Sequence, residues 1–108
     1  MSHQLMSLTA IEIDSRLDVF ADPLRTQIVG LLAREQLCTC HLVEDTGAKQ
    51  TTVSHHLKVL REAGMVESEP CGRFTYYRLR PDVLDELTRH LGELAAAARA
   101  AADVRRPC

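Results

Sequence analysis

The chain has 108 residues, of which 45% are hydrophobic, 26% charged and 4% aromatic, and its formal net charge at pH 7 is −2. This length fits one domain with a modest core. No apolar run is long enough to span a membrane, and no signal peptide opens the chain. We therefore expect a cytoplasmic protein whose four cysteines are thiols rather than structural disulfides.

The charges are unevenly distributed along the chain. Residues 49–80 carry six Lys or Arg against three Asp or Glu, whereas residues 1–48 carry three against seven and residues 81–108 carry four against five. The middle third is therefore locally basic, as contact with the phosphates of a nucleic acid requires. A solvated basic face would give the same counts.

The first third of the chain predicts two helices. Thr9 and Glu12 form a capping box that opens a helix over residues 8–20. Its apolar stripe consists of Ile13, Leu17 and Phe20. Asp22-Pro23 supplies an N-cap and a proline at the first helical position, so a second helix runs from there to about Ala33.

Residues 39–63 predict a helix-turn-helix. A short helix from Thr39 to Thr46 is closed by Gly47, and a second helix runs over residues 49–63 and ends at Gly64 as a left-handed cap. The apolar face of this second helix consists of Val53, Leu57 and Leu60. We call it the recognition helix, because its other face is polar and lies where such proteins read the major groove.

The polar face of the recognition helix gives the predicted DNA contacts. They are Gln50, Thr51, Thr52, Ser54, His55 and Lys58. Gln can pair with adenine, Thr can meet a thymine methyl group or a phosphate, and Lys58 is expected on a phosphate. His56 suits either helix packing or a base contact.

Residues 65–80 predict a β-hairpin, or wing. Its strands are Met65–Glu69 and Phe74–Leu79, and Arg73, Arg78 and Arg80 make it cationic. Arg73 at the tip can reach a phosphate or a minor groove, although an exposed turn arginine has the same pattern.

The last helix is predicted over residues 81–103. Its leucines follow a 3-4-3 spacing that is typical of a coiled-coil seam, at Leu84, Leu87, Leu91 and Leu94. We expect this helix and the first one to form a homodimer, because helix-turn-helix dimers read half-sites about 34–36 Å apart. The alternative is that the seam packs only on its own core.

Three separated motifs together resemble the ArsR/SmtB family of winged-helix repressors. They are Ala21-Asp22-Pro23-Leu24-Arg25, the segment from Val53 to Val66, and Gly72-Arg73-Phe74-Thr75-Tyr76-Tyr77. The resemblance implies a mainly α winged helix-turn-helix of about five helices and a two-stranded wing. It covers roughly residues 10–94 of the single domain expected over residues 1–108, and it implies a homodimer that represses an operon by binding double-stranded operator DNA until an inducer binds.

The segment Cys38-Thr39-Cys40 resembles the inducer site of the family's arsenic-responsive members. It departs from their commonest form at Val43, where a third cysteine often stands, and at His41, where an acid is usual. The resemblance implies arsenite or Sb(III) on Cys38 and Cys40, since soft thiolates select soft ions. Residues i and i+2 of a helix point to different sides, so binding is expected to distort the helix start.

The third ligand remains open between Cys108 on the tail, which we rank first, then Cys71 at the wing turn, and a non-protein group. A Cd(II), Zn(II) or Pb(II) site on the same thiols, with His41 as a further donor, is the main competing interpretation. The family's last-helix metal site does not map, because its positions hold Pro81, Val83, Leu94 and Ala97. A redox switch through a Cys38–Cys40 disulfide is a weaker alternative, since so small a ring is expected to be strained. No catalytic motif is present, so we expect no enzyme.

Overall fold

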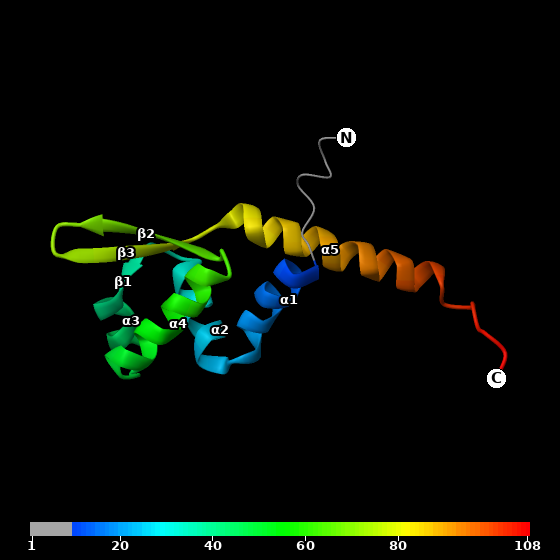
Figure 1. The fold of residues 1–108 in the computed structure, drawn as a ribbon, viewed down its shortest axis with the longest axis horizontal. Coiled ribbons are helices and arrows are strands. Elements are labelled where there is room, and N and C mark those ends of the chain that lie inside the picture. Colours follow the sequence, from blue (N-terminus) through cyan, green and yellow to red (C-terminus); the bar gives the residue numbers. More distant parts are fainter. Residues whose placement is uncertain (1–9) are drawn as a thin grey trace.

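The computed structural model describes residues 10–108 and forms an elongated molecule of 61 × 34 × 22 Å (Figure 1). In chain order the elements are α1 (Ala10–Asp18), the 3-10 turn η2 (Val19–Ala21), α2 (Pro23–Leu32), β1 (Leu37–Cys38), α3 (Thr39–Thr46), α4 (Gln50–Glu62), β2 (Val66–Cys71), β3 (Phe74–Leu79) and α5 (Pro81–Ala100). The mainly α winged helix-turn-helix expected from the sequence is confirmed. Thr9, the expected cap of α1, lies outside the described residues.

The helix boundaries follow local signals in the sequence. The Asp22 side chain accepts the backbone N–H of Arg25 at 3.0 Å, and Pro23 occupies the first turn of α2. Gly47 and Gly64 have φ values of 74° and 75°, the left-handed conformation that ends α3 and follows α4. L-residues with a Cβ rarely adopt this conformation, so both glycines fix where the helix-turn-helix bends.

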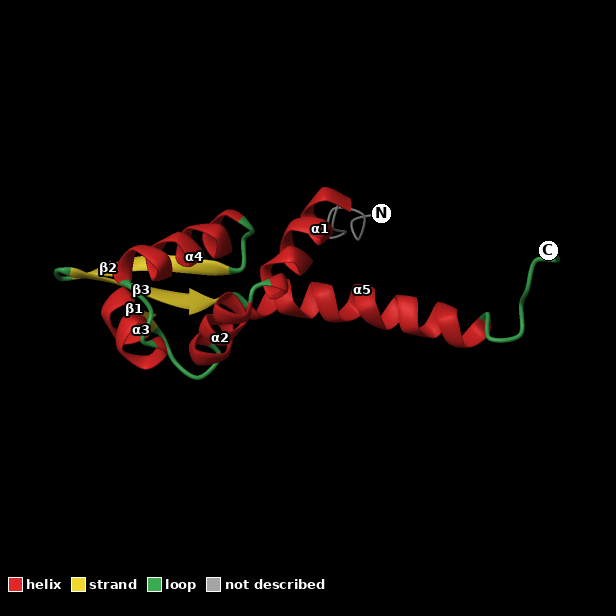
Figure 2. Ribbon diagram, turned by 90° about the horizontal axis from the view of Figure 1, so that it is seen from below, coloured by secondary structure: helices red, strands yellow, loops and turns green. Residues whose placement is uncertain are grey.

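Helices α2, α3 and α4 enclose the core together with the base of the wing and the first turns of α5 (Figure 2). The largest fully buried side chains are Ile28, Leu42, Leu57, Leu60, Met65, Val19, Val53 and Val83. The apolar stripe of α4 is thus completely covered, which leaves its polar side to face outward.

The sheet has three strands rather than the two expected, in the order β1-β3-β2. Leu37 pairs with Tyr77 and Cys38 with Tyr76, so the residues before α3 add an antiparallel strand to the wing. A two-residue strand carries no period-2 pattern, which is why the sequence did not reveal it. The hairpin turns at Gly72-Arg73, with Gly72 at φ 63° as in a type II′ turn.

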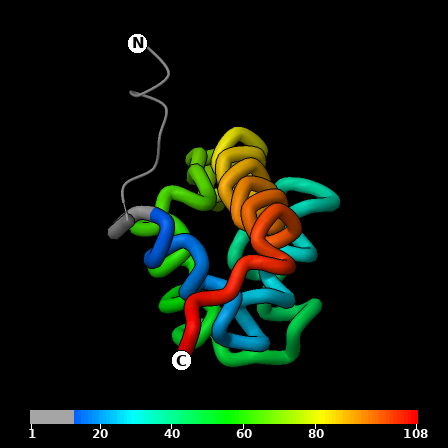
Figure 3. The backbone as a smooth tube through the Cα atoms, turned by 90° about the vertical axis from the view of Figure 1, so that its right-hand side faces the viewer, coloured from blue at the N-terminus to red at the C-terminus, as the bar shows by residue number. Residues whose placement is uncertain are grey.

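Helix α5 extends away from the globular part of the molecule, and Figure 3 looks along it from the end that carries the C-terminus. Its first turns are anchored by the buried Val83 and Leu87, whereas Leu91 and Leu94 are 47% and 55% exposed. The regular helix ends at Ala100, three residues before the expected limit. Within residues 10–108 no helix is both long and apolar enough to cross a membrane.

Candidate DNA-reading surface and cysteine site

The outer face of α4 carries the predicted DNA contacts on one solvent-facing surface. Gln50, Thr51, Ser54, His55 and Lys58 are exposed and Thr52 is half-buried, whereas Val53, His56, Leu57 and Leu60 are buried. The exposed set offers amide, hydroxyl, imidazole and ammonium groups, which are the groups that read base edges and phosphates.

His56 belongs to the packing of α4 and not to its exposed face. It is only 7% exposed, and its Nδ1 lies 3.2 Å from a guanidinium nitrogen of the buried Arg25. A guanidinium can only donate, so Nδ1 accepts and the ring is neutral with its proton on Nε2, which lies 3.8 Å from Asp22 Oδ1. Of the two alternatives for His56, the structure supports helix packing.

Arg25 ties the recognition helix to the corner between α1 and α2. Its Nε donates to the carbonyl of Val19 at 3.0 Å, and a terminal nitrogen donates to the carbonyl of Asp18 at 3.3 Å. Burial lowers the pKa of His56, and the charge of Arg25 acts in the same direction while Asp22 opposes it. The backbone N–H of Arg25 lowers the pKa of Asp22, so the carboxylate stays ionised beside this network.

The wing is less cationic than its sequence predicts. Arg78 pairs with Glu67 at 3.0 Å and Arg80 with Asp82 at 2.9 Å, so neighbouring acids neutralise both. Among the described residues Arg73 has no such ion pair, and it occupies the exposed turn at the tip. Arg73 is therefore the wing cation that remains available to a phosphate.

Cys38 and Cys40 lie where β1 passes into α3, and together they form the cysteine pair. Cys38 is the N-cap of α3, with an extended backbone at φ −89° and ψ 169°, and only Cys40 lies inside the helix. Their Cα atoms are 5.4 Å apart and their sulfurs are joined as a disulfide. The expectation that both cysteines are free thiols is therefore wrong, and Cys38 precedes α3, so the two cysteines do not both lie in regular helix.

The physical reason is the backbone of Cys38. An extended residue before a helix directs its side chain differently from a helical one, so the i, i+2 divergence of a regular helix does not apply. The Cα separation falls within the range that disulfides use. Cys38 is 3% exposed, whereas Cys40 is open to solvent, so one sulfur is held in the core and the other can be reached.

His41 is drawn into the same cluster. Its Nδ1 accepts the backbone N–H of Cys38 at 3.2 Å and lies 3.3 Å from the Cys38 sulfur. The donor atoms of Cys38, Cys40 and His41 all lie within 4.8 Å of one another. Once the disulfide is reduced, two thiolates and an imidazole suit zinc-like ions, and the thiolates alone suit softer ones. The spacing of Cys38 and His41, one turn apart, was the sequence signal for this third donor.

The other two cysteines are not in this cluster. Cys71 ends β2 and lines a separate cavity with Gln36, Glu69, Pro70 and Tyr76. Cys108 ends the tail that follows α5, at the opposite end of the long axis from the wing (Figure 1). Both are exposed. Within one protomer, neither is brought to the cysteine pair.

A cavity of about 280 Å³ adjoins the cysteine pair. Its walls come from the start of α3, the start of α4 and the tip of the wing, and they consist of Cys38, Thr39, Cys40, Gln50, Arg73, Phe74, Thr75 and Tyr77. Two predicted DNA contacts, Gln50 and Arg73, thus share one cavity with the predicted inducer ligands. Nothing in the sequence pattern indicated this, because the three segments meet only through the fold.

Comparison with known proteins agrees with this geometry. Residues 22–68 match the family model described as "Bacterial regulatory protein, arsR family". An arsenical resistance operon repressor of Staphylococcus xylosus is 35% identical over 80 residues, which cover 74% of this chain and 77% of the relative. The chain belongs to the ArsR/SmtB family. A repressor SmtB homolog of Synechocystis is 32% identical over 91 residues, or 83% of this chain and 69% of the relative.

A solved structure extends the likeness to the ArsR/SmtB fold as a whole. The homodimeric winged helix-turn-helix DNA-binding domain of a possible ArsR-family regulator from Mycobacterium bovis superposes with a TM-score of 0.66 at 26% identity. The match covers 89% of this chain and 88% of that domain. This ArsR/SmtB protein is accordingly a DNA-binding transcriptional regulator of a repressor family and not an enzyme, as its sequence predicted.

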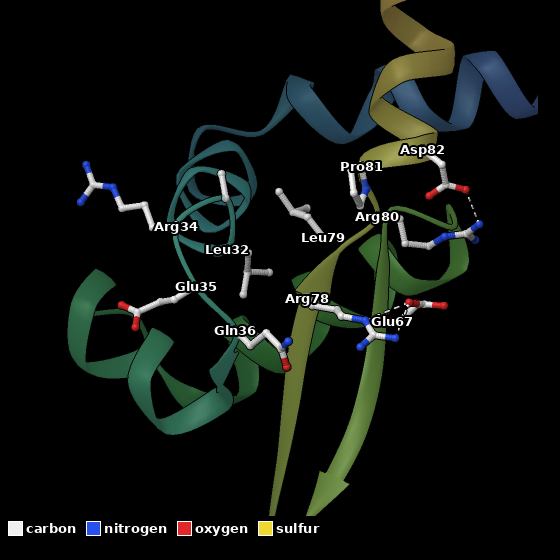
Figure 4. A pocket seen from close by; sticks show the side chains of 11 residues that line it. Leu32, Arg34, Glu35, Gln36, Glu67, Arg78, Leu79, Arg80, Pro81 and Asp82 are labelled. Carbon is white, nitrogen blue, oxygen red and sulfur yellow. Dashed lines mark hydrogen bonds and ion pairs between the residues drawn. The ribbon is translucent and has the colours of Figure 1, made fainter.

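Another cavity of this ArsR/SmtB regulator lies between the end of α2, the base of the wing and the start of α5, and measures about 550 Å³ (Figure 4). Four of its charged side chains form the Arg78–Glu67 and Arg80–Asp82 pairs, and Arg34 points away from it. It contains no cysteine or histidine. The cavity beside the cysteine pair is the better candidate for an inducer.

Proposed function

We propose that this ArsR/SmtB regulator binds operator DNA as a homodimer and releases it when trivalent arsenic or antimony binds the thiolates of Cys38 and Cys40. The observation that carries the proposal is the convergence of these two sulfurs at the N-terminus of α3, the helix that packs against the recognition helix. Arsenical repressors among its relatives support the choice of ion.

The DNA-binding half of the proposal rests on the exposed face of α4. Gln50, Thr51 and Thr52 lie in the first turn, which enters the major groove first in helix-turn-helix proteins. Ser54, His55 and Lys58 continue the same face, and Arg73 extends the contact to the wing. Lys58 and Arg73 position the protein on phosphates, whereas Gln50 contributes to sequence discrimination.

The homodimer is supported by apolar side chains that the protomer leaves uncovered. Leu17 and Phe20, at the end of α1 and in η2, are 39% and 41% exposed, and Leu91 and Leu94 on α5 are about half exposed. A second copy would bury these side chains and present two recognition helices to two half-sites.

The switch is a coupling between the cysteine pair and α4. Helix α3 packs against α4. An ion that binds both sulfurs imposes its own bonding geometry on them, and this shifts the N-terminus of α3 relative to the recognition helix. By linkage, an inducer that weakens DNA binding is itself bound more weakly by the DNA complex, by the same factor.

The test is a gel shift on the duplex upstream of the gene that encodes this chain, with protein reduced by a phosphine. Arsenite should release the DNA from the wild-type protein. Cys38→Ser and Cys40→Ser should bind DNA as tightly as wild type but resist release, whereas Cys71→Ser, a matched control, should respond normally. Release that persists in the Cys38→Ser/Cys40→Ser double variant would refute the site.

A second candidate inducer is Zn(II) or Cd(II), favoured by His41 in the donor cluster. His41→Ala would then abolish release by Zn(II) or Cd(II) while leaving release by arsenite intact. Equal loss of both responses would indicate that His41 acts only through the cap of α3.

A third candidate, thiol-redox sensing, is favoured by the disulfide between Cys38 and Cys40. Diamide would then release the DNA from wild-type protein without any metal, and the phosphine would restore binding. A gel shift that is identical under both conditions would remove the redox candidate.

A further inference from the structure

We propose that the cavity beside the cysteine pair receives an organic substituent carried by the inducer, so that mono-organic trivalent arsenic compounds are the preferred ligands and compete directly with DNA. This inference rests on the proposed function, since it specifies the ligand of the same site.

Trivalent arsenic forms three covalent bonds, and the described protomer brings only two sulfurs together. Cys71 lines another cavity, and Cys108 lies at the far end of the molecule. His41 Nδ1 is already engaged by the backbone N–H of Cys38 and is a harder donor than a thiolate. A compound R–As(OH)₂ needs two sulfurs and no more, because its arsenic–carbon bond already fills the third position.

The space for R is the cavity of about 280 Å³ beside the pair. Two aromatic residues, Phe74 and Tyr77, are among the residues that line it, and Thr75 lies between them in sequence. A closed apolar cavity of about 150 Å³ holds a benzene molecule in another protein, so a phenyl group fits in this volume. Apolar contact with the two rings would add to the two arsenic–sulfur bonds.

The covalent step is balanced without any oxidation or reduction of arsenic. The cysteine pair first has to be a dithiol, which a phosphine reductant provides. Two As–S bonds then form and two As–O bonds break, and each leaving hydroxide takes one thiol proton and departs as water. The product is R–As(S-Cys38)(S-Cys40), which carries no net charge.

The same cavity explains why such a ligand would oppose DNA. Gln50 and Arg73, which are the predicted base and phosphate contacts, are among the residues that line it. A group held between them occupies the space through which these side chains approach the duplex. Release then follows from direct competition at the surface as well as from any shift of α3.

The experiment compares phenylarsine oxide, which is hydrated to C₆H₅–As(OH)₂, with arsenite as releasing agents for the upstream duplex. Fluorescence anisotropy gives the half-release concentration of each compound, and the ultraviolet absorption of the arsenic–sulfur bonds gives binding to the free protein. The preference for the phenyl compound is the ratio of the half-release concentration of arsenite to that of the phenyl compound. Any dithiol favours the phenyl compound to some extent, so the decisive quantity is the change in this ratio when the cavity is filled.

Thr75→Phe fills the cavity, and Ser68→Phe adds the same ring to the neighbouring strand at a residue outside its walls. We expect the preference for the phenyl compound to fall by about tenfold or more in Thr75→Phe, because burial of an aromatic ring is lost. It should be unchanged in Ser68→Phe. Because a ratio is compared, a change in DNA affinity common to both titrations cancels.

The outcomes separate the two proposals. An unchanged preference in Thr75→Phe, or loss of the phenyl response in Cys108→Ser, overturns this inference while the proposed arsenic-responsive repressor stands. Failure of both compounds to release the wild-type protein overturns the proposed function itself. A preference for the phenyl compound that falls in Thr75→Phe but not in Ser68→Phe supports both proposals.

Discussion

The two long amphipathic helices of this protein, α4 and α5, differ in how far the protomer buries their apolar stripes. On α4, Val53, Leu57 and Leu60 are all buried within the protomer. On α5 the stripe is divided, because Leu87 is 4% exposed whereas Leu91 and Leu94 are about half exposed. The uncovered faces match the proposed partners, because α4 exposes a polar face to a polyanion and α5 exposes an apolar face to a second copy of the chain.

The largest expected effect comes from breaking the buried stripe of α4. Leu57→Ala leaves a cavity in the core and should lower the free energy of unfolding by about 2–5 kcal/mol in urea titrations. Leu57→Met keeps the volume and should cost less than about 1.5 kcal/mol. A loss for Leu57→Ala as small as that for Leu57→Met would mean that α4 is not fixed by this stripe.

Breaking the uncovered stripe of α5 should instead act on assembly. Leu91→Gln combined with Leu94→Gln should raise the dissociation constant of the dimer about a hundredfold or more, since each buried leucine contributes about 1.5–3 kcal/mol. Sedimentation velocity over a concentration series measures this. Glu93→Gln, on the same part of the helix, is the control, and a wild-type protein that is monomeric at micromolar concentration contradicts the comparison.

The polar face of α4 can be tested by its salt dependence. Lys58→Ala should weaken DNA binding similarly for all sequences and reduce the slope of log K against log salt by about one, as the loss of one phosphate contact requires. Gln50→Ala should leave that slope unchanged and relax discrimination between bases. Identical slopes for wild type and Lys58→Ala would place Lys58 away from the phosphates.

The smallest expected effect concerns the one polar group within the buried stripe of α4. Burial lowers the pKa of His56 in the folded protein. As the pH falls below the ordinary histidine pKa of about 6.5, His56 takes up a proton in the unfolded chain before it does so in the folded one, and this difference favours unfolding. This contribution to stability is complete above that pH and is lost as the pH falls towards the folded pKa. His56→Gln should flatten the decline in the free energy of unfolding between pH 7 and pH 5.

A control separates His56 from the other histidines. His90→Gln, on α5, is the matched control for replacing a histidine by glutamine. If His56→Gln and wild type lose stability in parallel, the neutral His56–Arg25 contact does not determine the response.

Local signals in the sequence determined the helices and the class of protein. Asp22-Pro23, Gly47 and Gly64 fix helix ends through interactions within a few residues, so their effect is the same in any fold. The polar face of residues 50–58 and the motifs shared with ArsR/SmtB repressors likewise belong to contiguous sequence. The cysteine pair was visible for the same reason.

Only the tertiary structure decided how these parts meet. The pairing of Leu37 and Cys38 with β3 holds Cys38 in an extended conformation, and this brings the two sulfurs together. The burial of Arg25 against His56 and the cavity shared by the cysteine pair, Gln50 and Arg73 join segments that are distant in sequence. Such contacts depend on the packing of whole elements, which leaves no periodic or short-range trace in the chain.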